Sequence, residues 1–125
     1  MIQYEGPGWR FERDTSRNKF TVLLGGDNWA VEIAEEEWNT LCEVLFRLID
    51  QYEKSKNQLM KEEQITLDLE KNPWWLSIEG DKKSWDLHLI LSSEKIKDRG
   101  LEIFWPSPTA EAITSVMRLM WDSKQ

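Results

Sequence analysis

His88 and Cys42, the single histidine and the single cysteine of this 125-residue sequence, are the residues that could support nucleophilic catalysis. A thiol needs an adjacent base to activate it, and the base needs an acidic group to orient it. His88 is out of phase with the apolar residues of an alternating segment, and Cys42 adjoins the apolar stripe of a helical segment. We therefore expect His88 on the polar face of a strand and Cys42 as a small buried residue. The protein is predicted not to be an enzyme.

The sequence also lacks the residue spacings that are typical of metal and cofactor sites. The sequence has no C-x-x-C or H-E-x-x-H pattern, and the run 35–37 places three glutamates around a helix rather than on one face. Gly6-Pro7-Gly8 is not followed by a helical pattern, and Gly25-Gly26 lies between two strand patterns, so neither is a phosphate-binding loop. We expect no metal and no cofactor.

The eight tryptophans are the most informative feature of the composition. Four of them fall on apolar stripes and are expected in the core: Trp29, Trp38, Trp85 and Trp121. Trp9 adjoins an arginine, and Trp74 and Trp75 must face opposite sides of one strand. For these three side chains, core packing, a protein interface and base stacking remain open interpretations.

The net charge of −7, from 16 basic and 23 acidic residues, is unevenly distributed. Residues 27–70 hold twelve acids against four bases, whereas 1–19 and 81–99 each carry +1. An acidic protein repels nucleic acid at long range, so binding of nucleic acid is disfavoured unless the two basic segments converge. The residues expected to form a surface for a partner or a nucleic acid are Trp9, Arg10, Arg13, Arg17, Trp74, Trp75, Lys82 and Lys83.

Apolar periodicity predicts the order of the elements. Alternating residues indicate strands at 9–13, 20–24 and 29–33, then at 65–69, 74–78, 85–91 and 101–105. Helical spacing indicates a helix from about 35 to about 60 and a C-terminal helix with Ser107 as N-cap and Pro108 at its first position. Turns are expected at 25–28, 72–73 and 80–83, and a polar loop at 92–100. The fold class is therefore α+β, a single domain over 1–125 in the order βββ-α-ββββ-α.

No apolar run exceeds three residues, and the first ten residues lack the apolar core of a signal peptide. With a single cysteine as well, we expect a cytoplasmic protein that does not enter a membrane. Strands followed by a helix occur twice, and Val31-Glu32-Ile33 is echoed by Leu101-Glu102-Ile103 at a shift of 70. This order predicts a duplicated sheet-plus-helix unit.

Several motifs together resemble a domain-of-unknown-function family of cyanobacteria and plastids. These motifs are Gly6-Pro7-Gly8-Trp9-Arg10, the segments 25–32 and 58–63, Trp74-Trp75, and Arg99-Gly100-Leu101-Glu102, and they span nearly the whole chain. The resemblance implies a fold similar to that of the Whirly-type single-stranded-DNA-binding transcriptional regulators, and it implies no assigned activity. The sequence departs from those regulators because it lacks their basic sheet faces and lysine-rich signature.

Three functions are therefore compared. The first is a non-enzymatic interaction or assembly module that binds a protein partner or forms a homodimer. The second is a single-stranded nucleic-acid binder, suggested by the fold resemblance. The third is an enzyme or small-ligand protein, which would require a closed polar pocket around His88. The first is preferred, because the tryptophan surplus and the long first helix support it.

Overall fold

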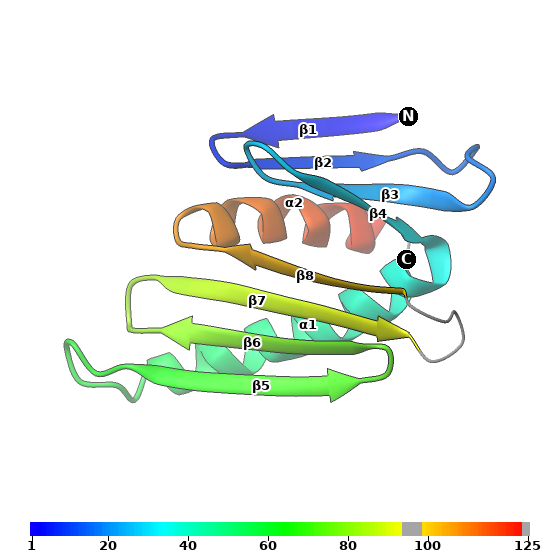
Figure 1. The fold of residues 1–125 in the computed structure, drawn as a ribbon. Helices are drawn as coiled ribbons and strands as arrows, with labels where there is room; N and C mark the ends of the chain where they lie inside the picture. The colour runs from blue at the N-terminus through cyan, green and yellow to red at the C-terminus, as the bar shows by residue number, and fades with distance from the viewer. Residues whose placement is uncertain (94–98, 124–125) are drawn as a thin grey trace.

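The computed structural model describes residues 1–93 and 99–123, which form two antiparallel four-stranded sheets and two helices (Figure 1). The first sheet contains β1 (Ile2–Gly6), β2 (Trp9–Arg13), β3 (Phe20–Gly25) and β4 (Ala30–Ala34), and α1 (Glu35–Lys56) follows it. The second contains β5 (Ile65–Lys71), β6 (Trp74–Gly80), β7 (Trp85–Ser93) and β8 (Arg99–Trp105), and α2 (Thr109–Ser123) follows. In both sheets neighbouring strands are consecutive in the chain. The predicted α+β class is confirmed, and the seven predicted strands and two helices occur in the predicted order.

The structure adds β1, which the sequence analysis did not predict. This strand pairs with β2 from Ile2↔Arg13 to Gly6↔Trp9, and all of its residues except Gly6 are exposed. An edge strand with no buried face lacks the alternation from which strands are recognised.

Several predicted boundaries also shift. α1 ends at Lys56, and α2 begins at Thr109, one residue after Pro108. Of the loop predicted at 92–100, residues 92–93 belong to β7 and residues 99–100 to β8, and residues 94–98 lie outside the described residues.

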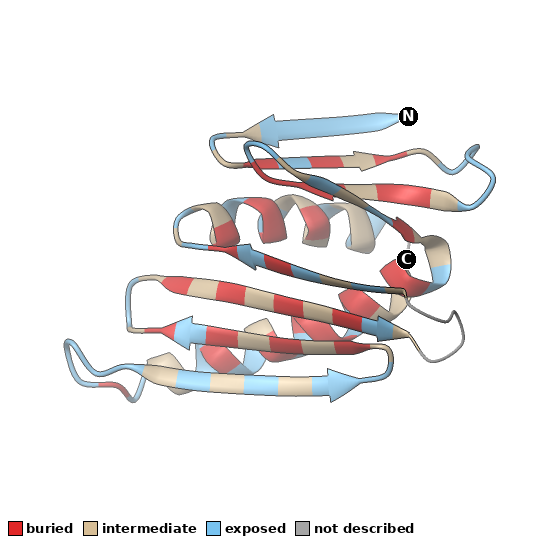
Figure 2. Ribbon diagram, viewed as in Figure 1, coloured by how far each residue is buried: buried red, intermediate tan, exposed pale blue. Residues whose placement is uncertain are grey.

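One apolar cluster joins both sheets and both helices. α1 packs on β5 and β6 and reaches β3 and β4, whereas α2 packs on β2 and β7. Alternate residues of β6 and β7 point into this cluster, and the stripes of Figure 2 show the alternation. Of the four tryptophans expected in the core, Trp38 and Trp85 are buried, and Trp29 and Trp121 pack against it partly buried, as predicted. Complete burial of a large apolar side chain contributes about 1.5–3 kcal/mol.

Trp105 fixes the second sheet to the first. Its indole Nε1 donates to the Gly25 carbonyl at 3.2 Å, and its ring stacks on Trp29 with the centroids 6.0 Å apart. β8 therefore has one face against the core and a second face turned away from it.

Within residues 1–93 and 99–123, neither helix combines the length and apolar character that a membrane span requires.

Candidate functional site

Trp9 and Trp74, two of the tryptophans expected on a partner surface, belong to the core. Trp9 is 8% exposed and Trp74 is 1% exposed. The Trp74 Nε1 donates to the main-chain oxygen of Glu37 at 2.9 Å, which satisfies its polar group inside the protein. The expectation that these two side chains form a binding surface is wrong, and core packing is the interpretation that holds.

Arg13 is also internal. Its Nη2 lies 2.6 Å from Glu35 Oε2, and its guanidinium lies 5.6 Å from the centroid of the Trp38 ring. The hydroxyl of Thr21 donates to the other oxygen of the same carboxylate at 2.6 Å. Because Arg13 is in phase with Trp9 and Phe11 on β2, the strand turns it inward. Arg13 therefore anchors the start of α1 and does not belong to a surface patch.

The four remaining basic residues of the predicted surface are exposed but scattered. Arg17 lies in the β2–β3 loop, 3.6 Å from a carboxylate oxygen of Glu32. Lys82 and Lys83 lie in the β6–β7 turn of the other sheet, at the opposite end of the molecule (Figure 1). Arg10 lies on β2 and is paired in register with Glu5. The basic residues therefore do not converge on one patch, which is the condition that nucleic-acid binding required.

Trp75, by contrast, lies on the outer face of the second sheet, as one member of the Trp74-Trp75 pair must. Figure 1 views this face directly, with α1 behind the sheet. Strand register sets out two rows across the four strands. One row is Glu70, Trp75, Ile90, Glu102, and the neighbouring row is Asp68, Ser77, His88, Phe104.

His88 joins the aromatic side chains of these rows. The Trp75 and His88 rings meet edge to face with centroids 5.3 Å apart, and the His88 and Phe104 rings do so at 6.4 Å. His88 Nε2 donates to Glu102 Oε1 at 2.6 Å, which orients the imidazole between the two larger rings. Phe104 is 53% exposed. The predicted orientation of His88, away from Leu87 and Leu89, is confirmed.

We call the set Trp75, His88, Ile90 and Phe104 the aromatic face. Carboxylates surround it, and no lysine or arginine occupies an outward position on the described strands of this sheet. The outward carboxylates are Asp68, Glu70, Glu79, Asp86 and Glu102. A surface of this kind has an apolar centre and a negative rim, and it attracts cations.

A hollow of about 240 Å³ adjoins the aromatic face near the β5–β6 turn. Trp75 and Ile90 contribute apolar surface to its wall, and Glu70, Asn72 and Ser92 contribute polar groups. The sheet face is therefore indented beside Trp75 and offers room for part of a side chain.

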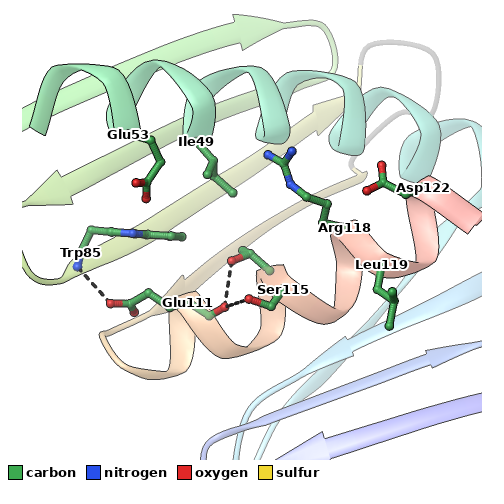
Figure 3. Close-up of a pocket in the computed structure, with 9 residues that line it drawn as sticks. Ile49, Glu53, Trp85, Glu111, Ser115, Arg118, Leu119 and Asp122 are labelled. Atoms are coloured by element: carbon green, nitrogen blue, oxygen red, sulfur yellow. Dashed lines mark hydrogen bonds between the residues drawn. The ribbon is translucent and has the colours of Figure 1, made fainter. Parts of the chain in front are cut away.

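A larger groove of about 420 Å³ lies between α1, α2 and the start of β7 (Figure 3). Arg118, one of its lining residues, pairs with Asp50 at 2.9 Å. The Glu111 Oε2 accepts hydrogen bonds from the Ser107 hydroxyl at 2.6 Å and from the Trp85 main-chain amide at 3.3 Å. These contacts tie α2 to its neighbours, so we assign the groove to packing and place the candidate site on the aromatic face.

Arg99 holds β8, which carries Phe104 and Glu102, against α1. Its Nε lies 2.9 Å from Glu37 Oε2, and its Nη2 lies 2.7 Å from Glu37 Oε1. Burial raises the pKa of the Glu37 carboxyl, but hydrogen bonds from Arg99 and from the Ala34 amide outweigh burial and bring that pKa below 4.5. The ion pair therefore fixes β8, the strand that carries Phe104, to α1 on the inner side of the sheet.

Cys42 and His88 do not form a pair, because they lie on opposite sides of the second sheet. Cys42 is buried on α1, which packs on the inner side, whereas His88 belongs to the outer face. Among the residues that the structure describes, no group of three or more His, Cys, Asp or Glu side chains could hold a metal ion.

Phe104, Ile90 and Glu102 were not singled out from the sequence. The available signal was the run Ile103-Phe104-Trp105, in which three apolar residues in a strand force the middle one to the opposite face. Ile90 gives the same signal between Leu89 and Leu91. Which outward residues lie side by side depends on strand register, and single strands do not reveal it.

The fold and this face together define an α+β protein with an open aromatic sheet surface. A family model described as a domain of unknown function, DUF1818, matches residues 4–120, so the chain belongs to that family. The chain is also similar to a crystal structure from Prochlorococcus sp. NATL2A, described as a protein with unknown function from the DUF155 family. That similarity has 46% identity and a TM-score of 0.90 and covers 97% of this chain and 99% of the other. No curated protein matches the chain.

Proposed function

We propose that this protein is a non-enzymatic interaction module that binds a protein partner through the aromatic face. The observation that carries the proposal is the continuous contact from Trp75 through His88 to Phe104 on the outer side of the sheet. Both helices pack on the other side, so Phe104 is exposed to a partner, and the Trp75 and His88 rings are partly exposed beside it. Aromatic residues on an open surface are the usual anchors of protein interfaces.

Single-stranded nucleic acid is the alternative occupant of such a face. Aromatic side chains on a four-stranded antiparallel sheet can stack bases. Four strands followed by a helix occur twice in the chain, as a duplicated sheet-plus-helix unit would require. A relationship to the Whirly-type regulators, which bind single-stranded DNA, would agree with this alternative. Phosphate binding, however, requires cations, and the outward carboxylates around the aromatic face oppose it. The charge favours a protein partner.

The proposal places the module in the cytoplasm. The support for this location is that a single cysteine cannot form a disulfide within the chain, so the fold does not need an oxidising compartment.

Photo-crosslinking tests the proposed function. A photoreactive benzoyl-phenylalanine replaces either Phe104 or Leu119, and each variant is irradiated in cells that contain the natural partners. The two positions are matched, since Phe104 is 53% exposed and Leu119 on α2 is 60% exposed. A protein adduct of one discrete mass is expected from position 104 only. Absence of an adduct at 104, or identical adducts at both positions, would refute the proposal.

A further inference from the structure

We infer that the segment of the partner that docks on the aromatic face is a positively charged, extended stretch of polypeptide. This inference rests on the proposed function and names the chemistry of the partner. It follows from what the face combines, namely rings that attract a cation and carboxylates that neutralise it.

Charge complementarity gives the first argument. The described outward positions of the second sheet provide no lysine or arginine to balance their carboxylates. These carboxylates are Asp68, Glu70, Glu79, Asp86 and Glu102. Among these, Glu102 is engaged by His88 and is still 66% exposed at its side chain. A basic segment would neutralise this rim, whereas an acidic segment would be repelled.

The row Glu70, Trp75, Ile90, Glu102 gives the second argument, because its two central residues are apolar and each end carries a carboxylate. A long basic side chain has the matching parts, an apolar stem and a charged head. The methylenes of arginine or lysine can lie on Trp75 and Ile90, in the hollow of about 240 Å³ that these residues line. The charged head then lies near Glu70 at one end of the row or near Glu102 at the other.

The length of the row also sets the separation between basic residues in the partner segment. Neighbouring strands lie about 4.8 Å apart, so three steps separate the two terminal glutamates by roughly 14 Å. An extended chain rises about 3.3 Å per residue, so two basic residues four positions apart would span that distance. The expected segment therefore carries basic residues with three residues between them.

The same charges argue against two other occupants. A second copy of this chain, docked through the same face, would place carboxylates opposite carboxylates, and the whole chain carries −7. Single-stranded nucleic acid would place phosphates against the same rim.

The test uses capped five-residue peptides as probes, with the full-length protein. The basic probe is Arg-Gly-Ser-Gly-Arg, and the matched controls carry glutamate or serine in place of both arginines. Binding is followed by the indole N–H signal of Trp75 in heteronuclear NMR spectra, assigned from its loss in a Trp75→Phe variant. The basic probe is expected to shift this signal saturably, and more weakly as salt is added, while the acidic and neutral probes leave it unchanged.

Variants of the rim separate specific binding from general attraction to an acidic protein. Replacing both ends of the row, as Glu70→Gln with Glu102→Gln, is expected to weaken the basic probe roughly tenfold, since two charge pairs are lost. The control pair, Asp27→Asn with Glu36→Gln, removes two exposed carboxylates elsewhere and is expected to leave affinity within about twofold.

Four outcomes of the binding experiments would overturn the inference. They are an unshifted Trp75 signal with the basic probe, an equal response to the acidic probe, an equal loss in the control pair, and tighter binding of a single-stranded oligonucleotide. If crosslinking at position 104 still captures a protein partner while the basic probe fails, the proposed function stands and only the charge assignment falls. Concentration-dependent dimerisation that Phe104→Ser abolishes would instead identify a second copy as the occupant.

Discussion

The indole of Trp75 and the imidazole of His88 meet at 88°, with their ring centroids 5.3 Å apart, on the outer face of the second sheet. The imidazole reaches from this contact to Phe104 on one side and to Glu102 through a hydrogen bond. The only histidine of the chain thus connects two aromatic rings and one carboxylate on neighbouring strands. This arrangement makes the face a single surface rather than a set of isolated exposed residues.

Ile103 and Phe104 are adjacent in β8, and substituting each of them tests whether Ile103 faces the core and Phe104 faces outward. Ile103 is 1% exposed, whereas Phe104 is 53% exposed. Ile103→Ala should lower the free energy of unfolding by about 2–5 kcal/mol, because it opens a cavity in the core. Phe104→Ala should change it by less than about 1 kcal/mol. Urea denaturation of the two variants measures both, and equal losses would show that Phe104 is a packing residue.

The Glu37–Arg99 ion pair should make stability sensitive to acid. Because the folded protein holds the pKa of Glu37 below 4.5, its contribution to stability is present above that pH. The contribution is lost as the pH falls through the lower pKa of the folded state. Glu37→Gln should therefore be less stable at neutral pH and should lose less stability on acidification than the parent protein. Denaturation midpoints measured from neutral to acidic pH test this, and parallel curves would contradict it.

Tyr52 should make the folded protein less stable as the pH becomes alkaline, whereas the Glu37–Arg99 pair makes it less stable in acid. Burial, reinforced by the nearby Asp81 carboxylate, raises the pKa of Tyr52 from 10.0 to about 12. Folding favours the neutral phenol, so this contribution is complete below pH 10.0 and declines as the pH rises towards about 12. Tyr52→Phe cannot ionise and should lose less stability across that interval. Thermal unfolding at several alkaline pH values provides the measurement, and an unchanged slope in the variant would refute the assignment.

Gly80 and Gly100 are a matched pair of strand glycines. A Cβ at Gly80 would lie 2.2 Å from the Ser84 main-chain oxygen, whereas the nearest atom to a Cβ at Gly100 is 3.4 Å away. Gly80→Ala should therefore destabilise the β6–β7 hairpin by roughly 1–3 kcal/mol, since the backbone must move. Gly100→Ala should have an effect below about 0.5 kcal/mol. Chemical denaturation that ranks them in the reverse order would show that the turn relaxes freely.

Alternation within β2, β6, β7 and β8 was sufficient to place most core residues, because each strand buries one face against the helices. The same rule placed His88 outward and required that one of Trp74 and Trp75 leave the core. It could have placed Arg13 as well, since Arg13 is in phase with Phe11, but a buried arginine is expected only when its partner is known. That partner, Glu35, is 22 positions away in the chain.

The candidate site was harder to predict than the fold. An arginine beside Trp9 suggested an exposed ring, yet neighbours in a strand point to opposite faces, so adjacency in sequence says nothing about a shared surface. The aromatic face is assembled by register across β6, β7 and β8, and its three rings, Trp75, His88 and Phe104, are separated by 13 and 16 positions. Separate strand patterns contain no information on that pairing.

Crosslinking from position 104 in the presence and absence of the Trp75 ring measures the central claim most directly. The photoreactive residue is placed at 104 in the otherwise unchanged chain and again in a chain carrying Trp75→Ala, with folding of both checked by denaturation. If the aromatic face binds a protein partner, the first chain forms a discrete adduct and the second loses most of it while remaining folded. An adduct of unchanged yield in the folded Trp75→Ala chain, or no adduct in either, would contradict the account.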